Sequence, residues 1–212
     1  MDITIIESFA ISVGIPALSL ILNGYVSLRK SNIELFFREL LKSGHDFSLM
    51  KNSEDLQRHF IYIIDKVSLE TNVEKIKKWK NAVINLTSDF KDFDFKDNFI
   101  SSLESLSVFD LTVLSLIYSK EPSNAFDPHF AQSITKKTGA YPGLVLQAYK
   151  KLLSHNLLEE EIKAKSLGGE VSMRYGGSGE VEDMNISIEV FYKCNPLGKQ
   201  FLKFIGDDYK GG

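Results

Sequence analysis

The stretch from Phe130 to Leu153 constrains the fold most, because it has the pattern of two helices joined by a tight turn. Gly139 stands between them, where a positive φ angle costs glycine nothing. Pro142 suits the first turn of the second helix, which needs no amide donor there. Apolar residues then recur at three- and four-residue spacing, namely Val145, Ala148, Tyr149 and Leu152. This spacing packs the second helix on the first and predicts a helix-turn-helix.

Two strands are predicted after the second helix. Residues 157–165 form the first, and every second residue from Ile186 to Cys194 is apolar in the other, as in a half-buried strand. The connection between them, residues 166–183, is rich in glycine but lacks the Gly-Lys-Ser/Thr ending of a phosphate-binding loop. We therefore predict a long two-stranded wing rather than a nucleotide site.

Two further helices complete the C-terminal part. Ser107 and Asp110 have the spacing of a capping box and begin a helix that we expect to end near Ser119. Asn195 and Pro196 form an N-cap followed by proline at the first helical position. A helix-turn-helix followed by a wing is typical of a winged-helix domain, which we place at residues 99–212.

Residues 1–98 are predicted to form a helical bundle. Ser31 and Glu34 suggest a capping box, and the helix that they begin should stop at Gly44. A second helix is expected from near Ser53 and a third from near Thr71 or Asn72. Their apolar faces are Leu56, Phe60, Ile63, Ile64 and Val67 in the second, and Val73, Ile76, Trp79, Val83 and Leu86 in the third. The fold class is thus mainly α, an N-terminal helical bundle followed by a winged helix-turn-helix.

The segment from residue 89 to residue 100 alternates charged residues with phenylalanine. Its carboxylates invite comparison with a calcium loop, but the central glycine and terminal glutamate of an EF-hand are missing. We expect a bridging segment that tucks its phenylalanines under the bundle and marks the domain boundary.

The N-terminal stretch from Ser8 to Leu28 contains no charged residue and is long enough to span a bilayer. Two interpretations of this segment stay open. It either contacts a membrane or forms a helix hairpin that is buried in the protein's own core or in that of a homo-oligomer. Arg29 and Lys30 would leave the remainder in the cytoplasm, and the acidic start of the chain argues against an export signal. The candidate membrane or oligomer contacts are Ile11, Val13, Ile15, Leu18, Leu20, Ile21 and Leu22.

No catalytic motif is found, so the sequence predicts a protein that is not an enzyme and needs no cofactor or metal. The four histidines, His45, His59, His129 and His155, stand apart and pair with no acid at ligand spacing. Cys194 is the only cysteine and lies on the apolar face of a strand, which favours a buried structural thiol.

The outward face of the second helix of the helix-turn-helix is where a DNA-binding member would read bases. Its leucines cannot read a base edge beyond a thymine methyl group. Residues 131–212 hold 11 Lys and Arg against 10 Asp and Glu, too little excess for phosphate-driven affinity. Exposed apolar residues favour protein contact instead. The predicted partner-binding residues are Tyr141, Gly143, Leu144, Leu146, Gln147, Lys150, Lys151 and, on the wing, Arg174.

The order of features resembles a loose group of bacterial and phage-encoded proteins that includes the abortive-infection alpha type. The resemblance rests on Gly14-Ile15-Pro16 leading through Arg29-Lys30 to Phe37, on the helical middle, and on the closing stretch from Tyr192 to Leu202, which contains Asn195-Pro196-Leu197-Gly198. It implies a setting in defence against phage, with no shared catalytic residue to transfer.

Three hypotheses follow. The first is a non-catalytic accessory or adaptor protein of a phage-related system that acts through protein contacts. The second is a DNA-binding transcriptional regulator, and the third is a membrane-associated effector that acts through residues 8–28. The first is favoured, with the protein in the cytoplasm.

Overall fold

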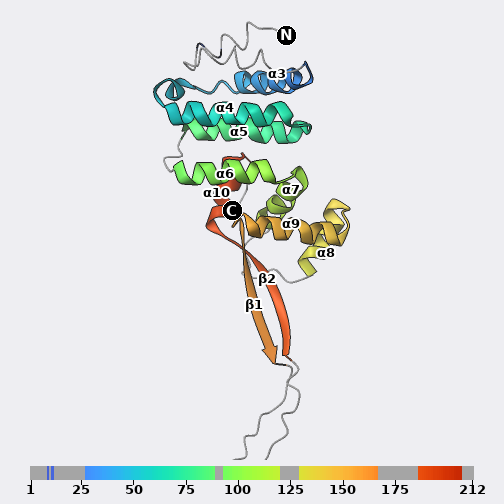
Figure 1. The fold of residues 1–212 in the computed structure, drawn as a ribbon. Coiled ribbons are helices and arrows are strands. Elements are labelled where there is room, and N and C mark those ends of the chain that lie inside the picture. Colours follow the sequence, from blue (N-terminus) through green and yellow to red (C-terminus); the bar gives the residue numbers. More distant parts are fainter. Residues whose placement is uncertain are drawn as a thin grey trace, which may run out of the picture.

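The computed structural model describes residues 27–88, 93–119, 129–166 and 186–206, together with Phe9 and Ile11. The chain is mainly helical, as predicted. Figure 1 shows α3, α4, α5 and α6 stacked in layers, α7, α8 and α9 beyond α6, and two paired strands extending away from the helices. In chain order the elements are α3 (Ser27–Lys42), the 3-10 helix η1 (Ser48–Asn52), α4 (Glu54–Leu69), α5 (Val73–Ser88), α6 (Phe93–Ser105), α7 (Val108–Ser119), α8 (His129–Thr138), α9 (Pro142–Ser154), β1 (Leu158–Ser166), β2 (Ile186–Cys194) and α10 (Pro196–Phe204).

Helix α3 begins four residues earlier than the predicted cap, so the expectation that Ser31 is its N-cap is wrong. Arg29 and Lys30 are good helix formers and extend the helix toward the N-terminus. Its end is as predicted, because Gly44 has a φ of +63° and its amide donates to the carbonyl of Leu41.

Helices α4 and α5 begin at the predicted caps. The Ser53 hydroxyl accepts from the amide of Leu56, and the Asn72 side chain accepts from the amide of Glu74 at 2.9 Å. All the expected apolar residues of these helices are buried except Val73, which is half exposed. The hydrophobic period therefore predicted which face of each helix enters the core.

Helix α6 replaces most of the predicted bridging segment, and that expectation is wrong for residues 93–100. The buried residues of this helix include Lys96, Phe99, Ile100 and Leu103, whose three- and four-residue spacing is helical, and Ser102 is buried beside them. The alternation of phenylalanine with charge conceals this period. Phe95, a part of that alternation, remains partly exposed.

The paired strands lie close to where the sequence places them. β1 runs from Leu158 to Ser166, so both of its ends lie one residue later than predicted, and β2 has the predicted bounds. The two pair antiparallel, with Leu158 opposite Cys194 and Ser166 opposite Ile186. Residues 167–185, which connect them, lie outside the described residues.

The apolar N-terminal segment is described at only a few positions. Phe9 is buried, with its ring centroid 5.1 Å from those of Phe37 and Phe47. Ile11 is 74% exposed, and the other candidate membrane or oligomer contacts lie outside the described residues: Val13, Ile15, Leu18, Leu20, Ile21 and Leu22.

Within the described part of the chain, no single helix has the length and apolar character needed to cross a membrane. One pair of helical segments, Phe95–Ser105 and Val108–Ser119, meets the requirement by length and composition only, with a bend of 118° between them. Leu103, Leu111, Val113 and Leu114 of this pair are buried in the protein's own core.

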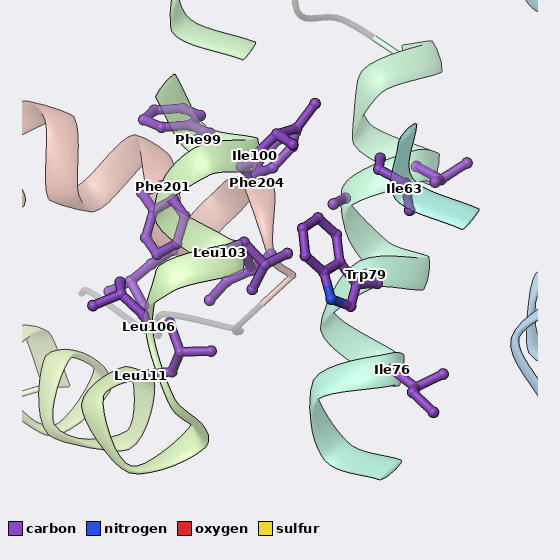
Figure 2. Close-up of a cluster of buried hydrophobic side chains, with 14 of the residues drawn as sticks. Ile63, Ile76, Trp79, Phe99, Ile100, Leu103, Leu106, Leu111, Phe201 and Phe204 are labelled. Atoms are coloured by element: carbon purple, nitrogen blue, oxygen red, sulfur yellow. The ribbon is translucent and has the colours of Figure 1, made fainter. Parts of the chain in front are cut away.

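One hydrophobic cluster runs through the described helices, from Phe9 to Ile205. Figure 2 shows its middle, where Trp79 of α5 faces Leu103 of α6. Phe99 of α6 packs against α10. Its ring centroid lies 5.5 Å from that of Phe201 and 5.4 Å from that of Phe204. The helical bundle and the C-terminal part therefore share one core across the predicted boundary at residue 98.

Side-chain amides of α5 also bind the C-terminal end of α10. Asn85 donates to the carbonyls of Lys203 at 3.1 Å and Phe204 at 2.7 Å, and Asn81 donates to the carbonyl of Ile205 at 3.0 Å. The last carbonyls of a helix have no partner within it. The Asn85 and Asn81 amides supply donors to the Phe204 and Ile205 carbonyls, and the Lys203 carbonyl also accepts from the amide of Gly206.

A second polar junction lies where α7, β1 and α10 meet. The Tyr118 hydroxyl faces the carbonyls of Leu157 and Asn195 at 2.9 and 2.8 Å and accepts from the Asn195 amide at 2.8 Å. The Asn195 side chain caps α10 by accepting from the amide of Gly198 at 2.7 Å. A Cβ at Gly198 would lie 2.2 Å from both the Leu157 carbonyl and the Tyr118 hydroxyl.

We predict that Gly198→Ala destabilises the protein by about 3 kcal/mol, because the added methyl group must displace backbone as well as a buried hydroxyl. Gly143→Ala is the matched control. Its Cβ would meet only the exposed ring of Tyr141, which has room to move aside, so its stability should stay within about 1 kcal/mol of wild type. Urea unfolding followed by circular dichroism measures both, and equal stabilities would contradict the prediction.

Candidate partner-binding surface

Helix α9 is held in one orientation by its buried face. Val145, Ala148, Tyr149 and Leu152 are all buried, as the sequence predicted. The Tyr149 ring lies 4.9 Å from that of Tyr192 on β2, which ties α9 to the strands. Because this face is fixed, the opposite side of α9 is presented on a rigid support.

The turn before α9 follows the predicted chemistry. Gly139 has a φ of +67°, and Pro142 occupies the first helical turn. A Cβ at Gly143 would lie 2.7 Å from the ring of Tyr141, so the absence of a side chain there leaves room for that ring.

The contact residues predicted for the outer side of α9 do lie at the surface. Tyr141 is 78% exposed, Leu144 45% and Leu146 47%. Gln147 and Lys150 are also exposed, and Gly143 is half-buried. At 100° per residue, Gly143, Gln147 and Lys150 form the row opposite the buried face, with the two leucines flanking it. The surface therefore has a polar centre and apolar edges.

Lys151 differs from its neighbours because it supports the helix as well as facing solvent. Its ammonium group lies 3.2 Å from Asp110 Oδ2. The same carboxylate accepts from the amide and the hydroxyl of Ser107, both at 2.8 Å, which confirms the predicted capping box of α7. Lys151 thus joins α9 to the start of α7, a role that the sequence did not indicate.

Two further exposed lysines come shortly before this surface in the chain and were missed by the sequence analysis. Lys136 and Lys137 end α8, are exposed, and come just before the turn that leads to Tyr141. Residues 128–158 contain four lysines and no Asp or Glu. The near-neutral sum over residues 131–212 concealed this local excess. Arg174, the predicted wing contact, lies outside the described residues.

A separate polar cluster joins α4 to α6 beside a cavity of about 340 Å³. His59 Nε2 lies 2.5 Å from Asp97 Oδ1, and its Nδ1 lies 2.7 Å from the carbonyl of Asp55. His59 therefore does pair with an acid, which lies on another helix at a separation that no local spacing indicates. Both ring nitrogens face oxygen atoms, so both contacts are hydrogen bonds only when each nitrogen carries a proton.

A second set of charged groups lies along the same two helices. Glu104 of α6 accepts from the Tyr62 hydroxyl at 2.5 Å and pairs with Lys66 at 2.7 Å. The hydrogen bond from Lys66, followed by that from Tyr62, lowers the pKa of Glu104. These groups bind one another across α4 and α6 and so contribute to the packing of the two helices.

The described residues offer no other strong sign of chemistry. Among them, no group of three or more His, Cys, Asp or Glu side chains lies close enough to hold a metal ion. Burial raises the pKa of Cys194 to about 11, so this thiol stays protonated near neutral pH. Cys194 is half-buried rather than fully buried, and its structural role stays a prediction.

No protein-family model, curated protein or solved structure matches the chain. Function is therefore inferred from the exposed face of α9 and from the lysines of α8.

His155 is the C-cap residue of α9, and its titration makes the stability of the protein depend on pH. Its Nδ1 lies 3.2 Å from the Ser102 hydroxyl, and burial, followed by the charge of Lys151, lowers its pKa. The unfolded chain then binds more protons than the native protein once the pH falls below about 6.5. Stability should therefore decrease from pH 7.5 to pH 5.5.

In urea unfolding at these two pH values, we expect the wild type to lose more stability than His155→Gln, which cannot titrate. An equal loss in both proteins would show that His155 makes no contribution.

Proposed function

We propose that the chain is a non-catalytic accessory or adaptor protein of a bacterial phage-defence or phage-related system. It binds a partner protein through the exposed face of α8 and α9. The observation that carries this proposal is the exposure of Tyr141, Leu144 and Leu146 at the start of α9, a helix whose inner face is fully buried. The phage-related setting comes from the resemblance of the sequence to the abortive-infection alpha group.

The arrangement of these apolar residues supports a protein contact. Single exposed apolar side chains are ordinary on a protein surface, but here three lie within six residues, at the N-cap and in the first turns of α9. Tyrosine is enriched among the residues that dominate binding energy. The helix is held by its buried face and by the Lys151–Asp110 pair, so little ordering would be needed on binding.

The C-terminal part is proposed to be a winged-helix domain used for protein contact. The order from α7 to α10, with the turn at Gly139 and two antiparallel strands before the last helix, supports this assignment. The polar junction of Tyr118, Asn195 and Gly198 would hold the base of the strands against α7.

DNA binding is the second candidate, and one observation favours it. The four lysines without any acid in residues 128–158 would attract phosphate. The two flanking leucines would gain little beside a sugar-phosphate backbone, which is why protein contact is preferred. The membrane-associated alternative rests on residues 8–28, and of these the structure describes only Phe9, Ile11, Ser27 and Leu28.

The test is co-expression of the tagged full chain with the products of its neighbouring genes. We expect a partner to copurify and Leu146→Asp to weaken the complex more than tenfold, because a charge would be placed in an apolar contact. Leu41→Asp is the matched control, since Leu41 of α3 is 46% exposed. Circular dichroism shows whether both variants remain folded.

A complex whose affinity is unchanged by Leu146→Asp would contradict the proposal. A gel shift with duplex DNA at low and moderate salt examines the second candidate, and a retarded band that Leu146→Asp does not affect would favour DNA.

A further inference from the structure

The charge on the α8–α9 face is one-sided. Lys136, Lys137 and Lys150 are exposed, and residues 128–158 supply no carboxylate to balance them. Lys151 is the one lysine of this region with a described carboxylate partner, the Asp110 of α7. The exposed acids Glu159 and Glu160 follow the C-terminal end of α9, whereas the α8 lysines stand before its N-terminal end.

The three lysines bracket the apolar residues. Lys136 and Lys137 precede the turn that carries Tyr141, and Lys150 follows Leu146 by four residues on the same side of α9. A partner that covers Tyr141, Leu144 and Leu146 must therefore approach ammonium groups at both ends of the contact. A neutral or basic partner would leave these charges unmatched or repelled.

We infer that the occupant of this face is an acidic, amphipathic segment of a partner protein, whose carboxylates meet Lys136, Lys137 and Lys150. Its apolar side chains cover Tyr141, Leu144 and Leu146. This inference rests on the proposed function and adds the chemistry of the partner. The apolar part gives the contact its affinity, while the charges speed association and select against basic segments.

Exposed ion pairs are individually weak and are screened by salt. Reversal of all three lysines should therefore weaken binding about tenfold or more at low salt, with a smaller effect at high salt. Loss of the apolar contact at Leu146 should weaken binding at both salt concentrations. The two kinds of variant can thus be told apart by their salt dependence.

The test uses the full chain and three synthetic 18-residue helical peptides that have leucines at identical positions. Their polar positions carry glutamate, glutamine or lysine. We expect affinity to fall in that order and the glutamate peptide to bind more weakly as salt is raised. The triple variant Lys136→Glu, Lys137→Glu, Lys150→Glu should bind the glutamate peptide about tenfold more weakly than wild type.

The matched control is Lys42→Glu, Lys51→Glu, Lys77→Glu, which changes the net charge equally at exposed lysines elsewhere. It should change the affinity less than about twofold. Equal binding of the glutamate and glutamine peptides, or no binding of the glutamate peptide, would overturn the inference.

Other occupants give different results. A 24-base-pair DNA duplex that binds more tightly than the glutamate peptide and displaces it would assign the face to nucleic acid. Self-association that Leu146→Asp abolishes would assign it to a second copy of the chain. If the genetic partner is released by Leu146→Asp but not by the lysine reversals, the proposed function stands and the acidic chemistry is wrong.

Discussion

The contact between α5 and α10 is the constraint on which the rest of the structure depends. Asn81 and Asn85 donate to the last carbonyls of α10, and Phe201 and Phe204 pack against Phe99 of α6. α10 is the last described helix of the chain, yet it fills the core of the helical bundle. The last carbonyls of an isolated helix have no partner within it. The bundle therefore supplies hydrogen bonds to the end of α10, and α10 in turn supplies apolar side chains to the core of the bundle.

This contact fixes the surface that we propose to be functional. From α10, the cap at Asn195 leads to the Tyr118 hydroxyl, which binds α7 to the start of β1. α7 in turn supports α9 through buried side chains and through Asp110 and Lys151. The outward residues of α8 and α9 are thus displayed on a frame that extends back to α5. Rigid display lowers the entropic cost of binding.

Local chemistry was predicted well from the sequence, and non-local chemistry was not. The caps at Ser53, Ser107 and Asn195 and the turn at Gly139 depend on residues a few positions apart, so their spacing specifies them. Ser31 has the same local pattern, but the helix-forming residues before it override the cap. The pairing of His59 with Asp97 and the amides of α5 on α10 join distant residues, which no pattern in one sequence reveals. The outer face of α9 was predicted from its helical period. The lysine excess of α8 and α9 was hidden, because the charge was summed over residues 131–212 instead of over these two helices alone.

The central claim is that the bundle and the C-terminal part form one cooperative unit through α10. Native-state hydrogen exchange at increasing, sub-denaturing urea tests it most directly. We predict that the slowest amides of α5, α9 and α10 converge on a single free energy of opening. If the amides of α9 and α10 exchange through an opening that leaves those of α5 fully protected, the two parts unfold separately and the claim is contradicted.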